Sequence, residues 1–176
     1  MSQLIVISAV GADRTGVVHD LSQVVLKNEG SILESRMVNL GSEFAMLLLV
    51  SGHWHTIGKL ESALTQFGES SDLTITLRKT SKRSDAAPLI PYAVDIVCLD
   101  QEGIVYNLSG FFSSRKVDIG ELNTRSYPAA HTGAPMFSVQ ATVHVPADIS
   151  IAALREEFMQ FCDHMNIDGI LEPIKV

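Results

Sequence analysis

The sequence has few cysteines, no long hydrophobic run and fewer basic than acidic residues. Two cysteines among 176 residues, Cys98 and Cys162, are too few for a disulfide framework and predict free buried thiols in a reducing compartment. The longest apolar run, Phe44 to Val50, is far shorter than the ~20 residues that cross a bilayer. The first residues lack a basic leader and a small-residue cleavage site. We therefore expect a soluble, cytoplasmic protein that does not bind membranes.

The shortage of basic residues argues against direct nucleic-acid binding. The chain has 13 Lys and Arg against 20 Asp and Glu, a formal net charge of −7. Proteins that bind DNA neutralise phosphates with Lys and Arg, and no helix-turn-helix pattern with a basic recognition helix is present. A short basic cluster within residues 78–83 is interpreted as part of a solvated linker. A hydrophobic content of 46% with 19% charged residues predicts a folded chain.

The sequence contains an internal duplication. At an offset of 87 residues, segment 13–22 aligns with segment 100–109 in the shared pattern D-x-x-G-[VI]-V-x-[DN]-L-S. A period of this length predicts two copies of one small domain rather than a solenoid. The polar, charged stretch between the copies has the composition of a linker. The predicted organisation is a first domain at 1–79, a linker at 80–90 and a second domain at 91–176.

Each copy shows the hydrophobic periodicity of a βαββαβ unit. Strand patterns lie at 4–10, 32–40, 44–50 and 73–77 in the first copy and at 93–99, 117–127, 137–145 and 167–174 in the second. Helical spacing follows Gly16 and recurs at 57–67, 104–112 and 151–161. This order predicts an α+β, ferredoxin-like fold, a four-stranded antiparallel sheet with both helices on one face. The central strands carry apolar residues on both faces, so we expect the other copy or a second chain to cover the uncovered face, in a homo-oligomer.

The turn between the first strand and the first helix is the one local signature common to both copies. A helix N-terminus presents unpaired backbone N–H groups and the positive end of the helix dipole, so it attracts a carboxylate. Asp13 or Asp100 could either cap its own helix or receive the ammonium group of an amino acid. The turn is not a dinucleotide motif, because G-x-G-x-x-G is absent, and it is not a phosphate loop, because Gly11 and Gly16 have the right spacing but no Lys-Ser/Thr follows.

The D-x-x-G turn within a duplicated βαββαβ unit resembles the ACT domain, a regulatory module that binds small molecules, chiefly amino acids. Segments 9–18, 35–44 and 49–54 more narrowly resemble the family of glycine cleavage system transcriptional repressors, and the likeness extends over essentially the whole chain. The resemblance implies two ACT domains in tandem and a repressor of glycine cleavage genes. It further implies action through contact with a DNA-binding activator protein, relieved by glycine.

The chain departs from the common ACT turn at two places. Thr15 and Glu102 stand where many ACT turns have proline before the glycine. Gln101 in the second copy replaces Arg14 of the first. The first turn is therefore the stronger candidate for a ligand site, and the second turn could be a structural relic.

The ACT resemblance gives a candidate ligand site in the first copy. Backbone N–H groups of the turn would meet the ligand carboxylate, Asp13 and Arg14 would supply charge, and two strand residues at the seam between the copies would complete the pocket. The set is Ala12, Asp13, Arg14, Thr15, Gly16, Val17, Ser35 and Asn123. A weaker second-copy set is Asp100, Gln101 and Gly103.

Other constellations of polar residues give weaker hypotheses. His53 and His55 could share a metal ion, but no third ligand lies nearby, so we expect exposed histidines at a helix start with Trp54 packed. Nothing marks Cys162 as an activated nucleophile. We predict no catalytic residue, no metal and no cofactor. The alternatives are an amino-acid-binding allosteric subunit of a metabolic enzyme, a small enzyme on the same fold, and a direct DNA binder.

Overall fold

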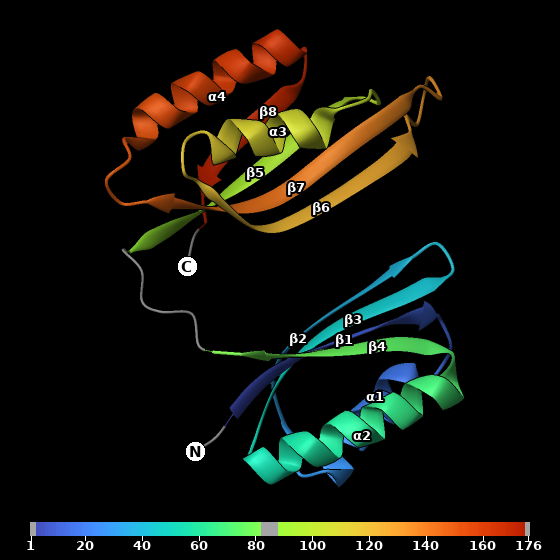
Figure 1. The fold of residues 1–176 in the computed structure, drawn as a ribbon. Helices are drawn as coiled ribbons and strands as arrows, with labels where there is room; N and C mark the ends of the chain where they lie inside the picture. Colours follow the sequence, from blue (N-terminus) through green and yellow to red (C-terminus); the bar gives the residue numbers. More distant parts are fainter. Residues whose placement is uncertain (1–2, 82–87, 175–176) are drawn as a thin grey trace. The chain divides into compact units, whose positions relative to one another are not determined.

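A computed structural model describes residues 3–81 and 88–174. The chain forms two compact units, Met1–Ser84 and Asp85–Val176, each with its own sheet and helices (Figure 1). The last strand of the first unit reaches Thr80 and the first strand of the second begins at Leu89. Regular strand therefore enters both ends of the predicted linker 80–90, whose residues 82–87 lie outside the described residues. The linker assignment stays a prediction.

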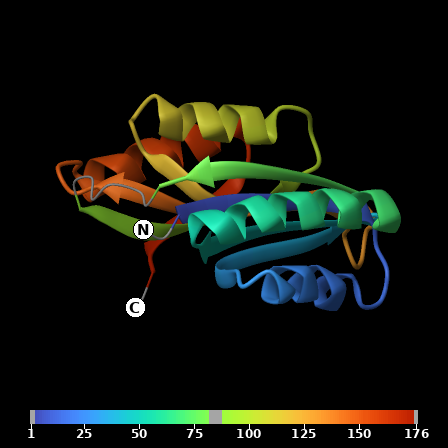
Figure 2. The same cartoon turned by 60° about the horizontal axis from the view of Figure 1, so that its bottom comes forward.

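The first unit has the predicted order βαββαβ. Its elements are β1 (Gln3–Ala12), α1 (Val17–Lys27), β2 (Ser31–Leu40), β3 (Glu43–Gly52), α2 (Trp54–Ser71) and β4 (Leu73–Thr80). The four strands form one antiparallel sheet in the order β2-β3-β1-β4. Helices α1 and α2 lie side by side on the same face of this sheet (Figures 1 and 2).

The second unit repeats this architecture. Its elements are β5 (Leu89–Leu99), α3 (Ile104–Ser113), β6 (Asp118–Pro128), β7 (Pro135–Pro146), α4 (Ile151–Met165) and β8 (Asp168–Pro173). The strand order is β6-β7-β5-β8, again antiparallel. The predicted fold class, two ferredoxin-like units in tandem, is confirmed. No helix of the described residues is long and apolar enough to cross a membrane.

Each unit has a separate hydrophobic core between its sheet and its helices. In the first unit, alternate residues of β1 such as Ile5 and Ile7 are buried, together with Leu48 of β3, Leu21 of α1 and Leu60 of α2. Alternation arises because successive strand side chains point to opposite faces, so only every second residue meets the helices. In the second unit, Phe111, Phe112 and Phe158 contact one another in the equivalent layer, with ring centroids 5.1 to 6.0 Å apart.

The face of each sheet opposite its helices, here called the open face, differs between the units. In the first unit it is apolar as predicted: Val10, Val38 and Leu47 are 45%, 45% and 51% exposed. Strand register places all three on this face, because Ala45 pairs with both Val10 and Val38, and Leu47 lies two residues further along β3.

The open face of the second unit contradicts the prediction of apolar residues on both faces of the central strands. Asp95 of β5 pairs with Gln140 of β7 on this face, and Ser138 lies two residues along from Gln140. The apolar run 93–99 contains Asp95 as its single charged residue, and alternation directs that side chain away from the helices. The two sheets therefore share a core pattern and present different outer surfaces.

Candidate functional site

The β1–α1 turn of the first unit connects an exposed loop to a buried helix start. Residues 12–16 are exposed, whereas the Val17 side chain is 3% exposed and belongs to the core. Gly16 precedes the helix with φ 92°, in the left-handed region that glycine adopts without steric cost. Of the predicted site residues, Val17 can therefore offer a ligand only its backbone.

Asp13 connects the turn to the far end of β2. The Asn39 side-chain amide donates a hydrogen bond to Asp13 Oδ2 at 2.8 Å, and the Asp13 backbone N–H donates to the Ser42 carbonyl at 3.0 Å. The N-cap position of α1 is held by Gly16, three residues after Asp13, and among the described residues the Asp13 carboxylate bonds to Asn39 and not to the N–H groups of α1. Of the two roles open to Asp13 in the sequence, the capping role is wrong. One carboxylate oxygen is held by Asn39, and this bond fixes the orientation of the other.

The second unit repeats this connection with different chemistry. The Ser126 hydroxyl donates to Asp100 Oδ2 at 2.8 Å, and the Asp100 backbone N–H donates to the Pro135 carbonyl at 2.9 Å. Gly103 precedes α3 with φ 84°, and this helix also lacks a side-chain cap. Bonding between the turn aspartate and a residue 26 positions later is thus a property of both units.

Arg14 is engaged by its own helix. Its Nη2 lies 2.8 Å from Asp20 Oδ2, in the first turn of α1, and both side chains are about 40% exposed. A ligand carboxylate at the turn would have to compete with Asp20 for this cation. Such an exposed pair contributes about 0–1 kcal/mol, so the competition is weak.

The second unit lacks both charges of this ion pair. Gln101 and Asn107 occupy the positions equivalent to Arg14 and Asp20. The Gln101 side-chain amide instead donates to the Met165 carbonyl, at 3.3 Å, near the end of α4. The turn of the second unit therefore keeps its aspartate and glycine and loses its cation.

The two predicted strand residues lie on different faces of their sheets. Ser35 pairs with the buried Leu48, so it lies on the helix-side face of the edge strand β2. Four residues of strand separate it from Asn39, about 13 Å, so the structure does not bring Ser35 to the turn. Asn123 pairs with Gln140, on the open face of the second unit. The roles assigned to the turn residues, to Ser35 and to Asn123 stay predictions.

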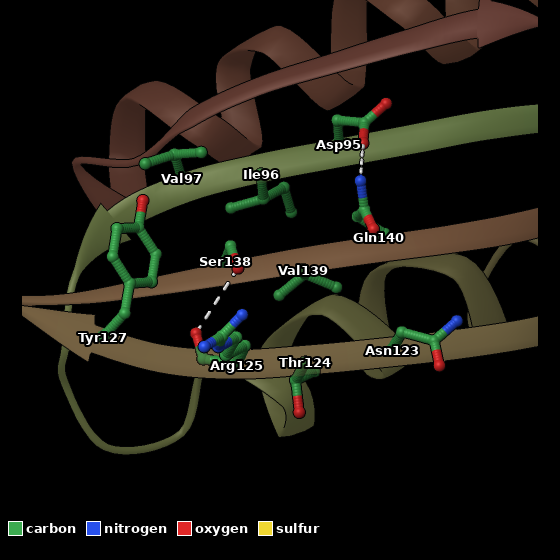
Figure 3. Close-up of a pocket in the computed structure, with 10 residues that line it drawn as sticks. All are labelled: Asp95, Ile96, Val97, Asn123, Thr124, Arg125, Tyr127, Ser138, Val139 and Gln140. Carbon is green, nitrogen blue, oxygen red and sulfur yellow. Dashed lines mark hydrogen bonds between the residues drawn. The ribbon is translucent and has the colours of Figure 1, made fainter. Parts of the chain in front are cut away.

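A hollow of about 650 Å³ opens on this second open face (Figure 3). The residues around it come from three neighbouring strands and include Asp95, Val97, Arg125, Tyr127, Ser138 and Gln140. Asn123 of β6 also lines the hollow, and it is the one lining residue that the sequence predicted as part of a site. The signal that could have identified the hollow is Asp95, the single charged residue in the otherwise apolar strand segment 93–99.

The cysteines are core residues, as predicted. Cys98 and Cys162 are free and buried. Burial, with smaller contributions from Asp163 and Asp168, raises the pKa of the Cys162 thiol to about 11. Burial is also the main cause that raises the pKa of Cys98. A raised pKa keeps a thiol protonated and unreactive near neutral pH, so neither residue has the character of a nucleophile.

The histidine pair lies at the start of α2. His53 and His55 are exposed there, as expected, whereas Trp54 is 65% exposed and was wrongly expected to pack. Its ring contacts only the adjacent His55 ring among the described aromatic contacts, with centroids 3.2 Å apart. Within residues 3–81 and 88–174, no three His, Cys, Asp or Glu side chains gather as they do around a metal ion.

Fold and turn together define the class of protein to which this chain belongs. Two βαββαβ units, each with an Asp and a left-handed Gly between its first strand and first helix, are typical of ACT domains. The ACT domain profile matches residues 3–78. The first unit is thus an ACT domain, and the second unit repeats its architecture.

Similarity over the full length narrows the class to one family. The chain is 30% identical over 170 residues to the glycine cleavage system transcriptional repressor of Escherichia coli (strain K12), covering 97% of this chain and 90% of that protein. The chain belongs to the family of this repressor, and the relationship supports a regulatory role.

Two solved structures are similar over the whole chain. A crystal structure of an unknown protein from Galdieria sulphuraria has a TM-score of 0.81 at 27% identity, covering 99% of this chain and 100% of that one. A crystal structure assigned to a glycine cleavage system transcriptional repressor has a TM-score of 0.78 at 26% identity, covering 100% and 99%.

The geometry of the turn predicts opposite effects for two glycine substitutions. A Cβ at Gly16 or at Gly58 meets no atom within 4 Å, but only Gly16 has a positive φ. Gly16→Ala should lower the free energy of unfolding by about 1 kcal/mol through backbone strain. Gly58→Ala, within α2, should raise it by about 0.5–1 kcal/mol through helix propensity. Denaturant unfolding followed by circular dichroism measures both, and shifts in the same direction would contradict this assignment of the turn.

Proposed function

We propose that this chain is a non-enzymatic regulator of transcription that lowers the expression of glycine cleavage genes. The observation that carries the proposal is the 30% identity, spread over 97% of the chain, with a protein named for this activity. Both units keep the ACT architecture, and the thiols have raised pKa values. These properties favour a binding protein over an enzyme.

The chemistry of the surface supports action through another protein rather than through DNA. A net charge of −7 opposes association with a phosphate backbone. The open face of the first unit instead presents Val10, Val38 and Leu47, an apolar surface of the kind that protein partners cover. We therefore assign the contact with a DNA-binding activator to this open face of the first unit.

The turn of the first unit suits the two ends of a small amino acid. Backbone N–H groups at the start of α1 offer hydrogen bonds and a positive dipole end to a carboxylate. Asp13, oriented by Asn39, offers a carboxylate to the ammonium group. Binding regulates only if the ligand prefers one conformation of the chain, and the Asp13–Asn39 bond gives the turn a connection to β2 through which this preference can act.

Calorimetric titration of the purified chain with glycine and with serine tests the sensing site. Glycine should bind the native chain, and Asp13→Ala should weaken binding at least about tenfold, because a charge-assisted hydrogen bond is lost. Asp100→Ala makes the matched change in the second turn and should leave glycine binding unaltered. Absence of heat at millimolar glycine would contradict the sensing proposal and leave the partner proposal standing.

A mobility-shift assay on DNA that carries the glycine cleavage promoter tests the mode of action. The purified chain alone should give no shift at physiological salt, whereas it should alter the complex formed by the DNA-binding activator. A shift by the chain alone that weakens steeply with salt would establish direct DNA binding instead. Failure to affect the activator, together with stable association with a metabolic enzyme, would favour the allosteric-subunit alternative.

A further inference from the structure

The open face of the second unit carries an acid, an amide and a cation on neighbouring strands. Asp95 of β5 is half-buried and pairs with Gln140 of β7, which in turn pairs with Asn123 of β6. The Gln140 amide donates a hydrogen bond to Asp95 Oδ1 at 3.4 Å. Asp95 thus lies at one side of the hollow with its carboxylate aimed along the sheet surface (Figure 3).

The cation lies across the hollow, one row further along the strands. Arg125 of β6 pairs with Ser138, and Ser138 pairs with Val97 of β5. The Ser138 hydroxyl donates to the Arg125 backbone carbonyl at 3.4 Å, and the Arg125 guanidinium lies beside Ser138 among the side chains that line the hollow (Figure 3). Tyr127 closes this end, with its ring near Val97 (Figure 3).

The two opposite charges do not meet each other. Two strand spacings and two residues of rise place the Cα atoms of Asp95 and Arg125 about 12 Å apart. Among residues 3–81 and 88–174, neither side chain takes part in an ion pair, whereas Arg14, Arg36 and Arg115 do. A short aspartate and a long arginine therefore face a gap that a molecule of a few atoms can bridge with one group of each charge.

The first unit shows that the fold does not require this charge pattern. The positions equivalent to Asp95, Gln140 and Arg125 are Ser8, Leu47 and Val38, which carry no charge. Ser8 there bonds to Thr76 of the neighbouring strand β4 at 2.6 Å. The two units share the turn and the core and differ at these three positions. A purely structural role for the charged set is therefore a poor explanation.

We propose that the hollow of the second unit binds a free α-amino acid with an apolar side chain. The carboxylate lies against Arg125, the ammonium group against Asp95, and the side chain against Val97 and Tyr127. A volume of about 650 Å³ exceeds what glycine fills and falls within the range of small-molecule sites. This site is separate from the Asp13 turn and does not depend on glycine binding there.

Titration of the full chain tests the ligand class. Leucine, methionine and phenylalanine are the probes, and at least one should bind at millimolar or lower concentration. The two halves of leucine, 4-methylpentanoate and isopentylamine, should each bind at least about tenfold more weakly, because each loses one charge-assisted contact. Equal binding of either half, or no binding of any of the three amino acids, would overturn the proposal.

Paired variants locate the site. Arg125→Gln and Asp95→Asn should each weaken binding at least about tenfold. Arg78→Gln on the open face of the first unit and Asp148→Asn in the exposed loop before α4 make the matched changes elsewhere and should not alter binding. Circular dichroism confirms that each variant is folded. Amide chemical shifts of Asn123 and Ser138 should move on ligand addition to the native chain, a readout that needs no variant.

The outcomes separate this site from the turn. Loss of binding in Asp95→Asn and Arg125→Gln, with Asp13→Ala unaffected, supports the hollow. Loss in Asp13→Ala alone would place the amino acid at the turn, which overturns this inference and agrees with the proposed function. Equal affinity for these amino acids in all variants overturns the assignment to the hollow, whereas the turn is tested separately by glycine titration.

Discussion

A four-stranded sheet has two faces, and two helices can cover only one of them. The hydrophobic core of each unit follows from that constraint, because the buried residues alternate along the central strands and form one cluster with buried residues of both helices. Residues on the open face contribute less to the core and can change with smaller consequences for the fold. The two copies differ accordingly: Leu47 and Val38 lie on the open face of the first unit, and Gln140 and Arg125 lie at the equivalent positions of the second.

The turn before the first helix has changed less than the open faces. Both units keep an aspartate that bonds to the end of the second strand and a glycine with positive φ before the helix. The charges around the aspartate differ, because the Arg14–Asp20 pair of the first unit has no charged counterpart in the second. The backbone path of the turn is therefore common to both units, whereas its charge is not.

The sequence predicts the architecture well, because internal repetition and hydrophobic alternation are local signals. The site is harder to predict, because it depends on which strands pair and in which register. The bond from Asp13 to Asn39 spans 26 residues, and no local pattern identifies its partner. The face of Ser35 depends on an irregularity between Ile32 and Glu34, which shifts the alternation of β2.

Errors of the sequence-based predictions have equally physical causes. Asp95 was overlooked because the residues around it in segment 93–99 are apolar. Strand alternation places its side chain on the open face, and one charged residue there changes the chemistry of that face. Trp54 was expected to pack because large aromatic residues usually do, yet within the first turn of α2 the buried side chains are those of Thr56 and Ile57, and Trp54 lies on the exposed side. The face on which Asp95 lies and the exposure of Trp54 both depend on how the strands and helices pack in three dimensions.

One pair of adjacent residues tests the one-sided organisation most directly. Leu47 and Leu48 follow each other on β3 and are 51% and 1% exposed. Hydrogen exchange of the full chain should show native protection throughout residues 3–81 in Leu47→Asp. Leu48→Asp should remove that protection, because an unpaired charge in the core costs more than about 4 kcal/mol. Equal loss of protection in both variants, or equal retention, would contradict the account.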